Sequence, residues 1–313
     1  MKVSVVIVTY NSLKWIEQCI DSIIKSTIEV TIIVVDNKST DETVSFLKNK
    51  YQDIIILIQA PENLGFGKGN NLGIKKAIEQ KSDYVFLLNQ DTIIEPILIE
   101  KLVFAARNNP KYGIISPVHL NYEGNDLEHY FSTYVSINKT PKFLFDHIVE
   151  EHTKDIYETN FVNAAAWLIP INVLKKVGGF DPIFWHYGED DNYGQRVKYH
   201  GFKIGIVPKV YIQHDSKERE TPKNYIFSRT YYLNYTRYLL IKYGDINKEL
   251  SPKSYKEERN TILNEVFINF LKLKFSKGLK HYKKISLLKD VFSKIESSRE
   301  KNVKVVSDFI YLK

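Results

Sequence analysis

The stretch VSVVIVTYN at residues 3–11 decides the fold of this chain. It begins with seven mostly apolar, β-branched residues, a composition typical of a strand buried on both faces. It then ends in the polar residues Thr9, Tyr10 and Asn11. A buried strand of this kind holds the side chains at its end in place without a flexible loop.

The same pattern recurs three times along the first 91 residues. Apolar runs occupy residues 30–35, 54–58 and 84–88, and segments with apolar residues at helical spacing occupy residues 13–26, 41–50 and 67–79. Strands that alternate with helices of this length form a parallel sheet with helices on both faces, and ligands bind at the carboxyl ends of its strands. The sequence therefore predicts an α/β fold.

The later part of the chain changes character near residue 221. Before that point, the sequence predicts helices at residues 96–108, 172–177 and 190–200. It predicts strands at residues 113–117, 161–169, 204–207 and 210–213. Residues 121–158 give no clear pattern. Long amphipathic helices with few turn signals follow from residue 225. We expect an α/β domain over residues 1–221, with halves at 1–118 and 119–221, and a helical region over residues 222–313.

Composition excludes several classes of protein. The single cysteine, Cys19, rules out an intrachain disulfide and a cysteine-based zinc site. The first ten residues lack the apolar core of a secretory signal, and no window reaches the length of a membrane-spanning helix. We therefore expect a cytoplasmic protein, either free or peripheral on the inner face of the membrane.

Charge is distributed unevenly along the chain. Residues 225–313 hold 19 Lys and Arg against 9 Asp and Glu, whereas residues 1–224 hold 25 against 28. A basic tail rich in aromatic residues such as Phe227, Tyr231, Tyr232, Tyr235 and Tyr238 predicts contact with an anionic membrane surface, or pairing of two copies as a homodimer. A solvated helical face and simple core packing are the alternatives. No nucleic-acid motif accompanies the charge.

Polar clusters follow all four N-terminal runs, at residues 9–11, 36–37, 60–63 and 89–91. Because parallel strands end at one edge of a sheet, these clusters should lie side by side and form a binding site. Helix capping is the alternative for Asn11 and Asp36. The segment 63–71 adds Asn63, Gly65, Gly67 and Asn70, whose backbone amides could approach a diphosphate closely. Its spacing is not that of a P-loop, and no glycine follows the first strand as an NAD site would require.

Two acidic clusters suggest chemistry. Asn89 and Asp91, on either side of Gln90, could hold Mg²⁺ or Mn²⁺ beside a diphosphate, although a turn would also explain them. Residues 185–191 read WHYGEDD, so that three aromatic residues precede the carboxylates of Glu189, Asp190 and Asp191. Crowded carboxylates beside an apolar wall have raised pKa values, which suits a general base, and Trp185, His186 and Tyr187 could stack on sugar rings. The alternative is favourable interaction with a helix dipole.

Together these motifs resemble the inverting glycosyltransferase family 2, whose members adopt the GT-A fold. The resemblance covers roughly residues 3–215 and lies in segments 5–11, 34–41, 63–71, 87–92, 178–181 and 188–191. It implies that Thr9, Tyr10, Asn11, Asp36, Asn63, Gly65, Gly67, Asn70, Asn89 and Gln90 bind the nucleotide-sugar, that Asp91 and His214 bind the metal, and that Asp190 is the catalytic base. The first half of the α/β domain would then bind the nucleotide-sugar and the second half the acceptor.

The pattern is most similar to the rhamnosyl- and galactofuranosyl-transferase branch, which builds bacterial surface polysaccharides. The resemblance implies a nucleotide diphosphate sugar as donor, UDP- or dTDP-linked, a glycan or lipid-linked glycan as acceptor, and a divalent cation as cofactor. Two positions depart from the family: Asn89 replaces an acidic ligand, and Asn192 stands where the branch often has Asp. A sugar nucleotidyltransferase and a catalytically silent carbohydrate-binding subunit are the alternative functions.

Overall fold

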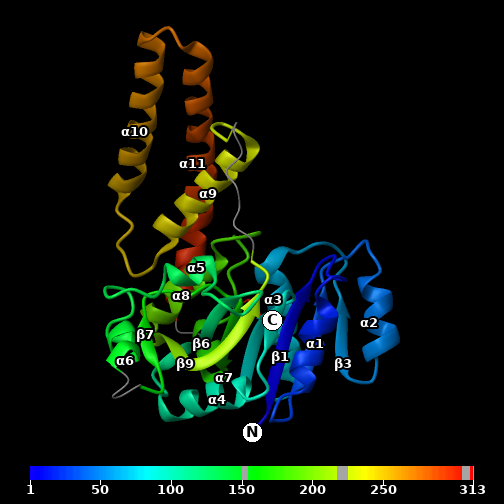
Figure 1. The fold of residues 1–313 in the computed structure, drawn as a ribbon. Coiled ribbons are helices and arrows are strands. Elements are labelled where there is room, and N and C mark those ends of the chain that lie inside the picture. The colour runs from blue at the N-terminus through cyan, green and yellow to red at the C-terminus, as the bar shows by residue number, and fades with distance from the viewer. Residues whose placement is uncertain (150–153, 217–224, 305–310, 313) are drawn as a thin grey trace. The chain divides into compact units, whose positions relative to one another are not determined.

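The computed structural model describes residues 1–149, 154–216, 225–304 and 311–312, and Figure 1 shows its helices and strands. The chain forms two compact units. The first comprises residues 1–218 together with 305–313, and the second comprises residues 219–304. Each unit is described by itself.

Within the described residues, nine strands of the first unit form one sheet in the order β3-β2-β1-β4-β8-β6-β9-β5, with β7 paired to β9. The strands are β1 (Val3–Thr9), β2 (Thr31–Asp36), β3 (Ile55–Gln59), β4 (Tyr84–Asn89), β5 (Thr92–Ile94), β6 (Tyr112–Asn121), β7 (Tyr157–Thr159), β8 (Ala166–Pro170) and β9 (Lys203–His214). The first four are parallel, as predicted, and Thr9 lies opposite Asp36 while Val8 lies opposite Asn89. Their polar ends therefore meet at one edge.

Beyond β4 the sheet is mixed, which the alternation of strands and helices did not indicate. Strand β8 runs antiparallel to both β4 and β6, and β6 runs parallel to β9. The carboxyl ends of β4, β6 and β9 and the start of β8 consequently lie at the same edge as the ends of β1 and β2. This arrangement places residues from both halves of the unit at that edge.

Three of the predicted strands need correction. The strand expected at 161–169 begins only at Ala166, and the two strands expected at 204–207 and 210–213 are one continuous strand, β9. Strand β9 passes through Pro208 because the pairing with β6 shifts register between Ser116 and Val118, which accommodates the missing amide hydrogen. Residues 121–158, for which no pattern was visible, contain α5 (His129–Ser132), α6 (Phe143–Val149) and β7.

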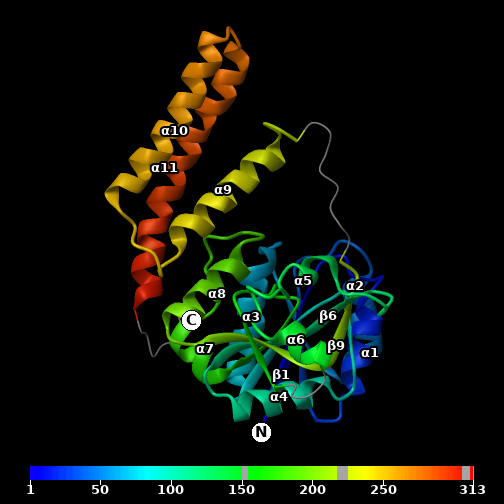
Figure 2. The ribbon, with the colours of Figure 1, turned by 60° about the vertical axis from the view of Figure 1, so that its left-hand side comes forward.

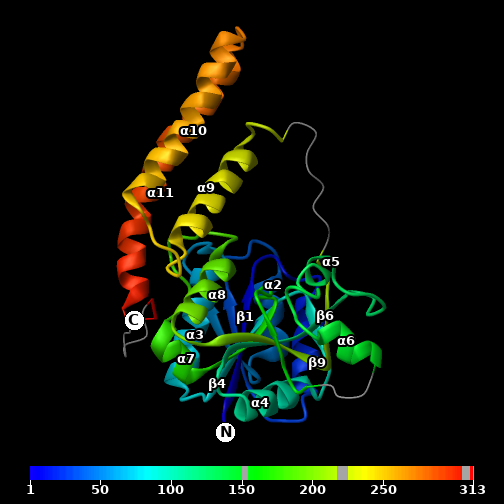
Figure 3. The same cartoon turned by 90° about the vertical axis from the view of Figure 1, so that its left-hand side faces the viewer.

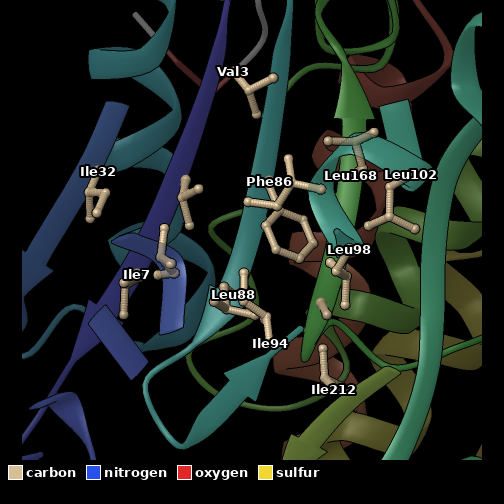
Figure 4. Packing of buried hydrophobic residues seen from close by; sticks show 14 of the residues in the cluster. Val3, Ile7, Ile32, Phe86, Leu88, Ile94, Leu98, Leu102, Leu168 and Ile212 are labelled. Atoms are coloured by element: carbon tan, nitrogen blue, oxygen red, sulfur yellow. The ribbon is translucent and has the colours of Figure 1, made fainter. Parts of the chain in front are cut away.

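Helices cover both faces of the sheet, as the sequence predicted. One face packs against α1 (Ile16–Ile24), α2 (Thr43–Tyr51) and α4 (Leu98–Asn108), and the other against α3 (Gly65–Glu79), α7 (Ile171–Val177) and α8 (Glu189–Tyr199). Figure 4 shows part of the first layer, where Val3, Ile7, Phe86 and Leu88 project from β1 and β4. Side chains alternate between the two layers along each strand, so both faces of the central strands are buried.

The second unit contains three helices among the described residues: α9 (Arg229–Gly244), α10 (Pro252–Leu271) and α11 (Phe275–Val303). Helices α10 and α11 lie side by side (Figures 2 and 3). Aromatic residues of α9 contact the other two helices: Tyr232 Oη donates to the Lys280 carbonyl at 2.9 Å, and Tyr235 Oη donates to Glu258 at 3.3 Å. No helix in the part of the chain that the structure describes is both long and apolar enough to cross a bilayer.

Helix α3 lies unusually close to the sheet at Gly73. A Cβ atom built on Gly73 would stand 2.2 Å from Val6 Cγ1 and 3.3 Å from Val35 Cγ2. Both valines are fully buried and belong to the central strands β1 and β2, so neither can move aside. Close packing in the core, and not helix propensity, therefore requires glycine here.

We expect Gly73→Ala to lower the free energy of unfolding by about 1–3 kcal/mol, because overpacking outweighs the ~1 kcal/mol that alanine contributes in a helix interior. Guanidinium unfolding of the full chain measures the change. Gly194→Ala in α8 is the matched control, since its Cβ would meet the end of the Ile204 side chain at 3.2 Å and the Phe161 ring at an ordinary contact distance of 3.9 Å. A rise in stability for Gly73→Ala would contradict the packing described.

Candidate active site

The carboxyl ends of β1 and β2 share one carboxylate. Thr9 Oγ1 donates to Asp36 Oδ1 at 3.3 Å, and the Ser39 amide donates to Asp36 Oδ2 at 3.1 Å. Thr9 and Asp36 are both buried. The two residues predicted to contact a nucleotide are therefore adjacent, and the Asp36 carboxylate is fixed in orientation by a hydroxyl and a backbone amide.

The loop after β1 forms hydrogen bonds with the turn after β4 and with the segment before α2. The Tyr10 amide donates to Gln90 Oε1 at 2.9 Å, which joins the end of β1 to the turn after β4. Asn11 has a left-handed backbone, with φ of 50°, and its Oδ1 accepts from the Thr40 amide at 2.8 Å. Asn11 therefore supports the segment before α2, as the capping alternative suggested, while the Tyr10 ring remains exposed.

The glycine-rich segment is held by Asn37, a residue that no sequence pattern marked as its anchor. Asn37 Oδ1 accepts from the Leu64 amide, and Asn37 Nδ2 donates to the Gly65 carbonyl, both at 3.0 Å. Gly65 has φ of +78°, and a Cβ there would stand 1.8 Å from the Trp185 carbonyl oxygen. Glycine at position 65 thus allows the backbone of the aromatic segment 185–187 to lie directly against the start of α3.

The side chains of the predicted residues Asn63 and Asn70 bond the backbone near them, and Gly67 packs against a neighbouring segment. Asn63 Oδ1 accepts from the Gly65 amide within its own turn, and the buried Asn70 donates to the Phe66 carbonyl within α3. Gly67 faces Phe180 and Glu189, where a Cβ would lie 3.1 Å and 3.5 Å from their Cβ atoms. The structure gives these three residues packing and backbone roles.

Three side chains meet where β4 and β9 end. His214 Nε2 lies 3.5 Å from Asp91 Oδ1 and 3.4 Å from Asn89 Nδ2, and the ring is almost wholly buried. His214 Nδ1 is buried without a hydrogen-bond partner. Among the described residues, no group of three or more His, Cys, Asp or Glu side chains is arranged to hold a metal ion. At this position the third side chain is the neutral Asn89.

This donor set nevertheless fits a divalent cation bound partly by substrate. A carboxylate and an imidazole 3.5 Å apart can contact the same ion, and Mg²⁺ or Mn²⁺ commonly completes its coordination with water and substrate phosphate oxygens. The loop containing Asp91 is anchored where its carbonyl accepts from the Asp215 amide at 3.0 Å. The two candidate metal ligands are therefore tied together through the backbone as well.

Two half-buried carboxylates stand in the first turn of α8. Burial raises the pKa of Asp190, against the lowering effect of backbone N–H groups that donate to it, including those of Asp191 and Ala164. Burial and the negative charge of Asp190 raise the pKa of Asp191 to about 7. The crowding expected from the sequence is present, and it produces a carboxyl group that titrates near neutral pH.

The aromatic segment before α8 combines exposure with an unusual backbone. Trp185 is 60% exposed and Tyr187 is 36% exposed, while the His186 and Tyr187 ring centroids lie 4.0 Å apart. Tyr187 has φ of 67°, and Gly188, the N-cap of α8, has φ of 91°. Successive left-handed residues, one of them aromatic, are costly and cluster at functional sites. They direct the chain from the exposed rings into the helix that carries Glu189, which is buried, and the two aspartates.

Residues 164 and 165 connect Asp190 to the end of β4 at Asn89, two residues before the candidate metal ligand Asp91. The Ala164 amide donates to the Asp190 carboxylate, and the Ala165 carbonyl accepts from the Asn89 amide at 2.9 Å. Tyr134 lies near both aspartates, since their charges contribute to the raised pKa of its hydroxyl, after the larger effect of burial. Tyr134 falls in the segment for which the sequence gave no pattern.

Two further buried residues that the sequence did not indicate support α8. Arg196 is fully buried and donates to the carbonyls of Gly179, at 2.6 Å, and Val177 at the end of α7. Asn71 exchanges two hydrogen bonds with the backbone of Phe180, both at 2.8 Å. These bonds join α3, α7 and α8 into one support beneath the acidic cluster.

A cavity of about 830 Å³ lies elsewhere, at the amino-terminal ends of β6 and β9. Its lining includes Tyr112, Lys139, Lys154, Glu158 and Lys203, and none of the predicted site residues. The candidate metal ligands at the ends of β4 and β9 and the carboxylates at the start of α8 therefore form a candidate site separate from this cavity.

Several known protein sequences are similar to this chain. A poly(ribitol-phosphate) beta-glucosyltransferase from Bacillus spizizenii is 35% identical over 100 residues, which cover 30% of this chain and 15% of that protein. Glycosyltransferase GlyG from Streptococcus pneumoniae is 23% identical, covering 90% of this chain and 87% of GlyG. An N-acetylglucosaminyl-diphospho-decaprenol L-rhamnosyltransferase from Mycobacterium tuberculosis is 25% identical, covering 67% of this chain and 75% of that protein.

Solved structures share the fold. S. aureus TarS 1-349 in complex with UDP-GlcNAc superposes with a TM-score of 0.55 at 17% identity, over 97% of this chain and 89% of that one. GalNAc-T7 with UDP, GalNAc and Mn²⁺ superposes with a TM-score of 0.58 at 16% identity, over 77% of this chain and 47% of that one. The sequence profile described as Glycosyl transferase family 2 matches residues 4–169, more than half of the chain, and the protein therefore belongs to that family.

Proposed function

We propose that this protein transfers a sugar from a nucleoside diphosphate sugar to an acceptor hydroxyl, with inversion at the anomeric carbon. The observation that carries the proposal is the carboxylate pair of Asp190 and Asp191, whose pKa values are raised where α8 begins. A base with a raised pKa can take a proton from a hydroxyl near neutral pH. The relatives named above support the reaction class.

The proposed mechanism is a single displacement with Asp190 as the base. Asp190 accepts the proton of the acceptor hydroxyl while that oxygen attacks the anomeric carbon from the face opposite the diphosphate. Bonds from the Asp191 and Ala164 amides hold the Asp190 carboxylate in one orientation, which reduces the entropy lost on reaching the transition state. The exposed rings of Trp185 and Tyr187 stack on the acceptor sugar.

The donor binds across the ends of β1, β2 and β4, with the base and ribose near Thr9 and Asp36. A UDP- or dTDP-linked sugar is the proposed class, supported by the UDP-GlcNAc in the TarS complex and by the rhamnosyltransferase among the sequence relatives. The name of that rhamnosyltransferase contains a diphospho-decaprenol, which supports a lipid-linked glycan as acceptor here. We place the reaction in the synthesis of a bacterial surface polysaccharide.

Asp91 and His214 are the residues that would hold a divalent cation, Mn²⁺ or Mg²⁺. When bound, such an ion offsets the negative charge that develops on the departing diphosphate. The Mn²⁺ that accompanies UDP and GalNAc in the GalNAc-T7 structure supports this assignment. Asn89 adds a neutral amide beside the pair, so we expect weaker ion binding than an acidic residue would give.

The function is tested by measuring nucleoside diphosphate release from UDP- and dTDP-sugars, with and without glycan acceptors. We expect release that depends on acceptor, and a loss of about 100-fold or more in kcat for Asp190→Asn, because a positioned base contributes roughly 10²–10⁴-fold. Asp191→Asn is the control and should retain most of kcat. If Asp191→Asn abolishes turnover while Asp190→Asn does not, the base is Asp191. A protein that binds donors without releasing diphosphate would contradict the proposed transfer.

The stability of the fold should depend on pH through Asp191. Asp191 has a pKa of about 7 when folded against 3.8 in its unperturbed state, so the folded chain binds its proton more tightly. Its ionisation therefore opposes folding increasingly as pH rises from about 4 to 7. We expect Asp191→Asn to raise Tm at pH 8 but not at pH 4.

Thermal unfolding across this pH range measures the effect. Asp215→Asn, which removes a carboxylate bonded to Lys14 and Trp15, is a comparison at the same edge that should not raise Tm at pH 8. Equal Tm changes for Asp191→Asn at both pH values would show that the charge of Asp191 is not the cause.

The metal assignment predicts that EDTA abolishes transfer and that Mn²⁺ restores it. Asp91→Asn and His214→Ala should each raise the Mn²⁺ concentration needed for half-maximal activity by about 10-fold or more, since each removes a ligand. Asn89→Asp should lower that concentration by supplying a third acidic or imidazole ligand. Isothermal titration with Mn²⁺ and donor provides a second measurement. Full activity in EDTA would contradict a metal at this position.

A further inference from the structure

The loop end of the α10–α11 hairpin exposes a cluster of apolar side chains. We define the hairpin tip as residues 267–280. Phe267, Leu271, Leu273, Phe275 and Leu279 are each between 55% and 77% exposed. Scattered apolar residues are normal on a protein surface, but a group of this size marks an interaction site.

The hairpin tip is an ordered turn. The Lys274 amide donates to the Asn269 carbonyl at 2.8 Å, and a Cβ on Gly278 would stand 2.1 Å from the Phe270 ring, so the two helices meet closely. Leu273 has φ of 55°, a left-handed conformation at the end of α10 that favours glycine or asparagine. A leucine that is 77% exposed there gains no burial to offset the strain, which indicates a role outside the unit.

The charge at the hairpin tip is entirely positive. Between Glu265 and Asp290 the sequence contains seven lysines and no Asp or Glu. Lys284 is buried and pairs with Glu265 at 3.0 Å, but Lys272, Lys274 and Lys277 are exposed and form no ion pair with any described residue. Three lysines therefore surround the apolar cluster with their charges uncompensated by the protein.

We propose that the hairpin tip docks on the surface of an anionic lipid bilayer. The apolar side chains enter the boundary below the headgroups, and Lys272, Lys274 and Lys277 contact the lipid phosphates. A second copy of the same tip is disfavoured as the occupant, because it would bring identical positive charges together. The proposed membrane contact therefore lies at the tip and not at Tyr232 and Tyr235, which are hydrogen-bonded to α11 and α10.

The test is co-sedimentation of the full chain with vesicles of phosphatidylcholine alone, or of equal parts phosphatidylcholine and phosphatidylglycerol. The chain should pellet with the anionic vesicles, and less so as salt is raised. The triple variant Lys272→Glu, Lys274→Glu and Lys277→Glu should lower the partition coefficient by about 100-fold or more, because each lysine at an anionic surface contributes about fivefold. The apolar variant Leu273→Ser with Leu279→Ser should also weaken binding.

The matched control reverses three exposed charges at the other end of α10: Lys253→Glu, Lys256→Glu and Arg259→Glu. It has the same net charge as the tip variant and should still pellet with the anionic vesicles.

Circular dichroism and Tm should be unchanged in the tip variants, because the altered side chains are exposed. Absence of wild-type binding to anionic vesicles, or equal loss in tip and control variants, would overturn the proposal. So would a dimer, seen by light scattering, that the tip variants dissociate without any change in vesicle binding.

Discussion

The antiparallel insertion of β8 between β4 and β6 is the constraint on which the rest of the site depends. A strand that runs against its neighbours begins where they end, so the residues leading into β8 lie at the carboxyl edge of the sheet. Ala165 bonds the end of β4 at Asn89, and Ala164 bonds Asp190. The end of β4 at Asn89, two residues before the candidate ligand Asp91, and the candidate base Asp190 are thereby held by two adjacent backbone groups, although they are about 100 residues apart in sequence.

The acidic cluster works against the stability of the fold. Burial raises the pKa values of Asp190 and Asp191, and the negative charge of Asp190 raises that of Asp191 further, which means that the folded state resists their ionisation. Hydrogen bonds from buried side chains hold the surrounding backbone in place: Arg196 donates to the Gly179 carbonyl, and Asn71 makes two bonds with the backbone of Phe180. Partial burial raises the basicity of these carboxylates and lowers the stability of the fold, a trade-off that is common at active sites.

Polar residues at the strand ends can contact a ligand or hold the surrounding loops in place, and the sequence does not distinguish these two roles. The pattern of strand ends predicts that Asp36 and Gln90 contact a ligand, and both also bond the loops around them. Asn37 directly follows Asp36 in the same polar cluster, yet its side chain anchors the glycine-rich segment. Gly65 is required because the Trp185 backbone approaches it, a contact between residues about 120 positions apart that no local pattern contains.

The sequence by itself determined the four parallel strands, the helices between them, the acidic start of α8 and the basic helical region, because hydrophobic periodicity and charge are local properties. The order of the second half of the sheet, the roles of Tyr134 and Arg196, and the exposure of the hairpin tip were decided by tertiary structure. Pairing between distant strands and the burial of individual side chains depend on which surfaces meet. A leucine such as Leu273 can occupy a hydrophobic core or an exposed turn, and only the packing around it shows which of these environments it has.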